Sequence, residues 1–151
     1  MADENILSGD RSGFAANNMH QILAVEESNV LPGTALAALV AVGRGGEVAR
    51  AKADSGDSTY VTGLAVKAGV SGERVHTQYA GPLVLSTEQW DAIAEDTSVG
   101  LENGAPYYLS ATTAGKITKT LPGAGFAAPV GVATSPTCLL INIGFPSVII
   151  P

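Results

Sequence analysis

The chain has 151 residues, of which 46% are hydrophobic, only 5% aromatic and 15% charged. Its net charge of −6, with eight scattered basic residues, argues against binding a nucleic-acid backbone, which needs clustered lysine and arginine. Its 18 glycines, with abundant alanine, valine and threonine, suit tight turns and β-sheet packing rather than a helical bundle. We therefore expect one mainly β domain, a small β-barrel or sandwich, with enough chain to bury a core.

Targeting signals and disulfides are not expected. No stretch reaches the roughly 20 apolar residues that span a bilayer, and the first residues carry acids where a signal peptide has positive charge. We expect synthesis in the cytoplasm and no membrane partner. Cys138 is the single cysteine, so no intrachain disulfide can form. Its place in an apolar run favours a buried small side chain over a catalytic nucleophile.

Residues 1–30 are predicted to form an extended N-terminal arm followed by a first strand, ahead of a β-barrel domain in residues 31–151. The first 18 residues are polar, small and aperiodic, whereas residues 19–25 are apolar enough for a strand. The arm is either a mobile terminus or a segment that becomes ordered on a neighbouring subunit or a larger surface.

Two segments, residues 33–65 and 104–133, follow one plan. Each has an entering strand, a glycine turn, a returning strand and the start of a third strand. The corresponding glycines are Gly33, Gly46 and Gly63 in the first segment and Gly104, Gly115 and Gly131 in the second. We therefore expect a body built from two similar β units.

One short helix is expected between the units, near residues 86–97. Ser86 is a good N-cap, and Gln89 completes a capping box. Three apolar residues then share one helix face at the spacing i, i+3 and i+4: Trp90, Ile93 and Ala94. The helix is expected to cover one open end of the β body, with Trp90 as its anchor.

The C-terminal part is strongly apolar. A Pro/Gly loop is expected at residues 121–129 and a strand at residues 137–143, and an apolar tail bracketed by prolines ends the chain. An apolar terminus left in water favours aggregation. The tail is therefore expected to be covered either by its own domain or by a neighbouring chain.

Catalytic and metal-binding patterns do not stand out. His20 and His76 lack metal-ligand spacing, and no nucleophile elbow occurs. Residues 53–58 match a calcium loop only in part, because a spaced set of oxygen ligands ending in Glu is missing. We expect no enzyme activity and no cofactor. Tyr107 and Tyr108 could stack on a sugar, but neighbouring strand residues point to opposite faces, which predicts one in the core and one at the surface or an interface.

The chain resembles the capsid decoration, or cement, proteins of tailed bacteriophages, and also β modules of phage fibres. The resemblance covers about residues 31–144 and rests on structural glycines and apolar positions in residues 63–65, 73–75, 81–85, 86–94, 100–110 and 129–133. It implies a β-barrel body on the outer surface of the phage head, as part of the virion. There it would bind the major capsid protein at junctions between subunits, preferably as a homotrimer, with a dimer as the alternative. It assigns no catalytic residues.

In such a protein the two termini would be the reaching elements, because many weak contacts on one shell act together. The predicted capsid or subunit interface consists of Ile6, Leu7, Arg11, Phe14, Met19, Tyr107, Phe145, Val148, Ile149 and Ile150. Two alternatives remain open. One is a fibre or spike module that binds a host surface glycan through exposed tyrosines, and the other is a small hydrolase that uses His20 or His76.

Overall fold

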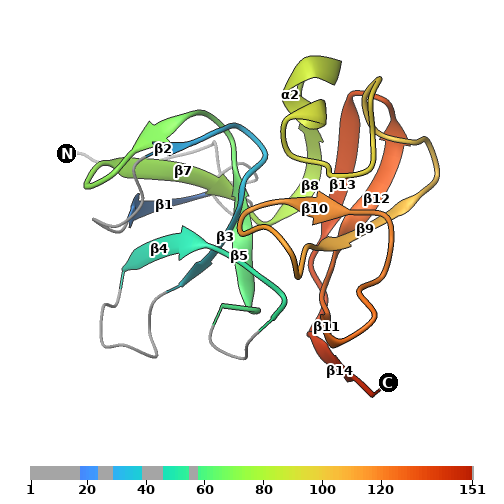
Figure 1. Ribbon diagram of the computed structural model, residues 1–151. Coiled ribbons are helices and arrows are strands. Elements are labelled where there is room, and N and C mark those ends of the chain that lie inside the picture. Colours follow the sequence, from blue (N-terminus) through green and yellow to red (C-terminus); the bar gives the residue numbers. More distant parts are fainter. Residues whose placement is uncertain (1–17, 24–28, 39–45, 55–57, 151) are drawn as a thin grey trace.

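The computed structural model describes residues 18–23, 29–38, 46–54 and 58–150. Within these ranges strands hold 47% of the residues and helix 4%, which confirms a mainly β domain with one short helix. Two β units lie side by side, and the C-terminal end of the chain extends from the second unit (Figure 1).

The first unit is a closed five-stranded barrel. In order around the barrel, its strands are β1 (Asn18–Leu23), β4 (Glu47–Arg50), β3 (Ala35–Ala38), β5 (Val61–Ala65) and β7 (Arg74–Gln78). The apolar side chains described inside it are Leu23, Val30, Leu36, Val48, Ala65 and Val75. β1 closes the barrel by pairing with β4 and β7. The boundary predicted at residue 30 therefore does not separate the first strand from the body.

The second unit is a five-stranded antiparallel sheet. In order across the sheet, its strands are β10 (Ile117–Thr118), β9 (Pro106–Leu109), β12 (Pro129–Ser135), β13 (Cys138–Asn142) and β8 (Ala80–Val84). Pro82 lies in β8 and cannot donate a ladder hydrogen bond, which is tolerated because β8 is an edge strand of this sheet.

Both units share one strand order. The order β4-β3-β5-β7-β1 of the first corresponds to β10-β9-β12-β13-β8 of the second. Two of the matched glycine pairs also have the same left-handed backbone. Gly33 and Gly104 have φ angles of 88° and 84°, and Gly46 and Gly115 have φ angles of 85° and 83°. The prediction of two similar β units is confirmed.

The helix α2 (Thr87–Asp91) is shorter than the 86–97 predicted, although it begins as expected. The Ser86 hydroxyl accepts a hydrogen bond from the Gln89 N–H at 3.1 Å, and the Gln89 side-chain oxygen accepts one from the Ser86 N–H at 2.9 Å. This is the predicted capping box, which satisfies two N–H groups that the first turn leaves free.

A tertiary contact ends the helix early. The Ile117 N–H of β10 donates to the Ile93 carbonyl at 3.1 Å, and the Glu95 N–H donates to the Ile117 carbonyl at 2.9 Å. Ala94 thus forms a parallel bridge with Ile117, much as β1 pairs in parallel with β4 in the first unit. These backbone groups are used by β10 and cannot continue an α-helical ladder.

Trp90 anchors the helix as predicted. Its side chain is fully buried, and its indole N–H donates to the Thr137 carbonyl at 2.9 Å. The ring packs over Gly33, where an added Cβ would lie 3.2 Å from the nearest ring carbon. The helix therefore covers one end of the β body.

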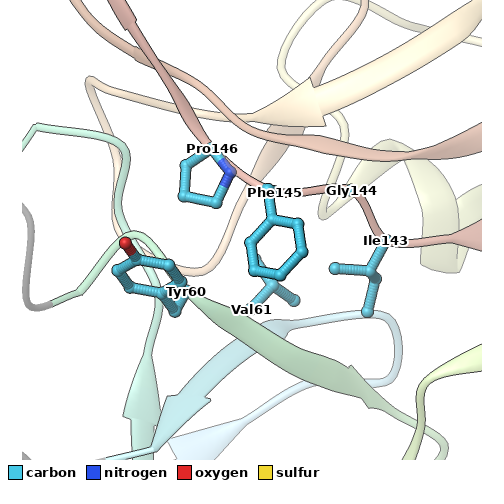
Figure 2. Close-up of a pocket in the computed structure, with 6 residues that line it drawn as sticks. All are labelled: Tyr60, Val61, Ile143, Gly144, Phe145 and Pro146. Atoms are coloured by element: carbon cyan, nitrogen blue, oxygen red, sulfur yellow. The ribbon is translucent and has the colours of Figure 1, made fainter.

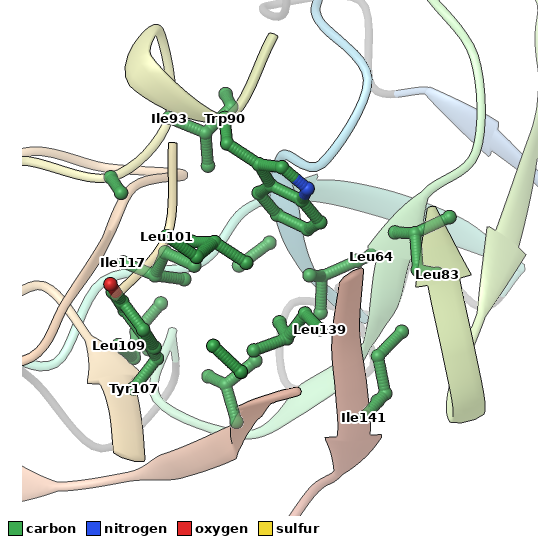
Figure 3. Packing of buried hydrophobic residues seen from close by; sticks show 14 of the residues in the cluster. Leu64, Leu83, Trp90, Ile93, Leu101, Tyr107, Leu109, Ile117, Leu139 and Ile141 are labelled. Atoms are coloured by element: carbon green, nitrogen blue, oxygen red, sulfur yellow. The ribbon is translucent and has the colours of Figure 1, made fainter. Parts of the chain in front are cut away.

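One apolar core joins the two units (Figure 3). The outer face of β3 and β5 contributes Ala35, Ala37 and Leu64, and the inner face of the second sheet contributes Leu139 and Ile141, among others. The small alanine side chains let the second sheet approach β3 closely. The two units therefore form one packed body.

Two short two-stranded sheets complete the fold. β2 (Asn29–Val30) pairs with β6 (Gly69–Val70), and β11 (Gly125–Ala127) pairs with β14 (Ser147–Ile149). β11 lies inside the segment 121–129 that was expected to be a loop. It becomes a strand because the C-terminal tail pairs with it.

Candidate interaction surface at the C-terminal tail

The C-terminal tail leaves three large apolar side chains in solvent. Phe145 is 88% exposed, Val148 67% and Ile150 87%. Tyr60, just before β5, adds a ring that is 58% exposed beside Phe145. We call these four residues the tail surface. The described part of the chain does not cover it.

Backbone contacts hold the tail in place on both sides. The Gly144 N–H donates to the Pro129 carbonyl at 3.1 Å, just before Phe145. Farther along, Val148 of β14 pairs with Phe126 of β11, whose N–H donates to the Ala53 carbonyl at 3.1 Å. The tail surface is therefore preformed, which lowers the entropy cost of binding a partner.

A small apolar pocket lies at the base of the tail. It has a volume of about 140 Å³, and Figure 2 shows Phe145 and Pro146 of the tail opposite Tyr60 and Val61. Small-molecule sites usually measure about 300–1,000 Å³, so this pocket is small for a metabolite. Its size and apolar lining suit a single apolar side chain of a partner protein.

The C-terminal part of the sequence, which supplies three of the four residues of the tail surface, has no charged side chain. Lys119 is the last charged residue, and residues 120–151 contain none. The Lys52–Asp54 ion pair lies beside β11, because the Ala53 carbonyl between them accepts a hydrogen bond from the Phe126 N–H. Binding at the exposed apolar side chains of the tail would be driven mainly by apolar burial.

The carboxylate of Asp96, in the segment after α2, has a structural role. The Asp96 carboxylate accepts hydrogen bonds from the hydroxyls of Thr118 and Thr120 at 2.9 and 3.0 Å and from the Lys119 N–H at 3.2 Å. Burial raises the pKa of Asp96, but these hydrogen bonds to the ionised form outweigh burial and hold the pKa below its ordinary value. Asp96 thus fixes the segment after α2 onto β10 as an ionised carboxylate.

Tyr107 lies in the core, which differs from its predicted place on an interface. Its side chain is fully buried, and its hydroxyl accepts a hydrogen bond from the Glu102 N–H at 2.9 Å. Burial raises the pKa of Tyr107 above its ordinary value. Tyr108 is half-buried on the opposite face of β9, so the two tyrosines divide between core and surface as strand alternation requires.

The other predicted interface residues have different placements. Phe145, Val148 and Ile150 are all exposed along the tail, while Ile149, between the last two, is half-buried. Met19 lies in β1, but its side chain is outside the described part of the chain. Four further residues lie outside the described residues altogether: Ile6, Leu7, Arg11 and Phe14.

The register of β1 and β7 pairs the two histidines, His20 with His76. In the described ranges, no three His, Cys, Asp or Glu side chains are grouped so that they could hold a metal ion. The calcium-like loop at residues 53–58 is described only in part, and its Asp54 forms an ion pair with Lys52 at 2.9 Å. No described helix is long and apolar enough to cross a membrane.

Tyr60 was missed by the sequence reasoning. Its contact with the tail joins segments about 85 residues apart, and no local pattern indicates such a pairing. The charge-free stretch after Lys119 is the one signal in the sequence that could have marked this end of the molecule as a contact surface. Comparisons with protein-family models and with curated proteins find no match for this chain.

Proposed function

We propose that this chain is a capsid decoration protein of a tailed bacteriophage, with no catalytic role. It binds the outer surface of the head, holds neighbouring major capsid protein subunits together, and acts as an oligomer, preferably a homotrimer. It is made in the host cytoplasm and ends in the virion. The resemblance noted in the sequence supports this assignment.

The observation that carries the proposal is the tail surface. A compact β body presents Phe145, Val148 and Ile150 to solvent in and beside β14, in a segment without charged side chains. Such a surface suits a protein partner more than a small substrate. On a shell, many copies act together, so each contact can be weak and the array still stays bound. The N-terminal arm remains a predicted second contact.

Binding to phage heads tests the proposal. We expect the purified protein to bind expanded heads that lack it and to raise their melting temperature. The double variant Phe145→Lys/Val148→Lys should reduce binding at least about tenfold, because a buried unpaired lysine costs more than 1.4 kcal/mol. Val70→Lys is the matched control, since Val70 is also an exposed valine in a strand but lies in the first unit.

Full binding by the double variant, with its fold intact by circular dichroism, would contradict the role of the tail. Absence of any head binding by the unaltered protein would contradict the proposal itself.

A glycan array tests the alternative function, binding of a host surface glycan. If the chain is a glycan-binding module, the parent protein should bind a sugar on the array and the Tyr60→Ala variant should not. The reason is that Tyr60 offers the exposed ring at the pocket.

A further inference from the structure

The second unit has a sheet face that the described residues leave uncovered. The strands β9, β12, β13 and β8 turn one side toward the core and the other toward solvent, because side chains alternate along a strand. Val132 lies opposite both Leu140 and Pro106, and Leu140 lies opposite Pro82, so these four residues form one row across four strands. Val132 is 42% and Leu140 43% exposed, and both prolines are exposed.

This outward face, which we call the sheet face, contains no charged residue. Its members are Ala80, Pro82, Val84, Pro106, Tyr108, Val132, Thr134, Cys138, Leu140 and Asn142. An antiparallel sheet that faces water normally carries polar side chains on that side. The sheet face therefore has the composition of a buried surface, although the described chain leaves it open.

The first unit provides an internal comparison. β7 occupies the same place in its unit as β13, and its outward residues are Arg74, His76 and Gln78. The equivalent outward positions of β13 are Cys138, Leu140 and Asn142. The same strand position of the shared fold is therefore polar on its outward side in the first unit and largely apolar in the second.

The same comparison indicates what kind of surface covers this face. β3 and β5 correspond to β9 and β12, and their outward residues Ala35, Ala37 and Leu64 are buried against the second unit of the same chain. The outer face of one such unit is therefore a surface on which another unit of this fold already packs. The sheet face of the second unit has no such cover from the described chain.

We propose that the sheet face is where a second copy of this chain binds. Each copy carries a net charge of −6, so two copies repel one another wherever their acidic surfaces meet. Contact through the sheet face brings no like charges directly together and buries apolar side chains on both copies. This inference rests on the self-association in the proposed function, but not on binding to a capsid.

The size of the face sets the strength of the contact. Four strands about 4.8 Å apart, each a few residues long, cover less than the roughly 800 Å² per partner of a standard interface. The association should therefore be weak and should depend on protein concentration in the micromolar range. On a crowded surface the same contact would be favoured by the high local concentration.

Sedimentation velocity of the isolated full chain, from about 1 to 200 μM, tests the inference. We expect the average mass to rise with concentration. Val132→Lys should weaken the association at least about tenfold, because the contact would bury a lysine without a partner. Val70→Lys is a closely matched control: both valines are 42% exposed and in strands, and the change in net charge is the same.

Leu140→Lys, on the neighbouring strand, provides a second variant in case Val132→Lys fails to fold. The unaltered chain offers an independent readout, because its single cysteine, Cys138, lies on the sheet face. Its alkylation by a maleimide should slow as the protein concentration rises. A monomer throughout the range, or lysine variants that associate like Val70→Lys, would overturn the inference. Head binding is measured separately, so failure of the capsid role remains distinguishable.

Discussion

Asp96 shows how a single carboxylate fixes a junction between elements. Its hydrogen bonds with Thr118, Thr120 and the Lys119 N–H tie the segment after α2 to β10. Asp96→Asn keeps the size of the side chain but removes its charge. It also places an amide N–H₂ group against the hydroxyl and N–H groups that now donate to Asp96, so we expect a loss of about 1–2 kcal/mol in unfolding free energy at pH 7. Chemical denaturation measures this, with Glu73→Gln as a control on an exposed acid.

The pH dependence of this loss follows from the sign of the pKa shift. Because the folded pKa of Asp96 lies below its ordinary value of about 3.9, its contribution is present above that value. It is lost as the pH falls through the lower, folded pKa. The difference between the parent and Asp96→Asn should thus be constant from pH 7 to about 5 and should shrink below about 4. A difference that grows in acid would contradict this role.

At the scale of elements, local signals were predictable and tertiary ones were not. The capping box and the buried face of Trp90, Ile93 and Ala94 followed from spacing alone. The early end of the helix did not, because it depends on β10. Similarly, β11 exists because the distant tail pairs with it, and β propensity is strongly context-dependent. The sequence showed that the tail is apolar, but it did not show which of its side chains are exposed, nor that Tyr107 rather than Tyr108 points into the core.

Gly125 tests whether β11 positions the tail. It has a φ of +92°, and an added Cβ would lie 2.6 Å from the Ala53 carbonyl oxygen. Gly125→Ala should therefore release β11 and β14 at a cost of about 1–3 kcal/mol, while the body stays folded. We expect faster hydrogen exchange confined to residues 125–127 and 147–149. Gly123→Ala is the control, since a Cβ there meets nothing within 4 Å, and equal exchange in both variants would refute the effect.

At the scale of the whole molecule, duplication explains why two units form one domain. The repeated glycine plan made the two units predictable from sequence. Their joint packing was not predictable, because the alanines on the outer face of β3 give no sign of what covers them. Among the described residues, the interior of the first unit holds Leu23, Val30, Leu36, Val48, Ala65 and Val75, and the larger apolar cluster lies in the core that the units share. We therefore expect neither unit to be stable alone.

This shared core predicts a single unfolding transition. Leu64 is fully buried where β5 meets the second unit, so Leu64→Ala should cost about 2–5 kcal/mol by opening a cavity between the units. Calorimetry should still show one transition, with equal calorimetric and van't Hoff enthalpies, because loss of the shared core unfolds both units together. Leu36→Ala, inside the first barrel, is the matched comparison and should also leave one transition. Two separate transitions in either variant would mean that the units fold independently, and the shared core would then not be the source of their stability.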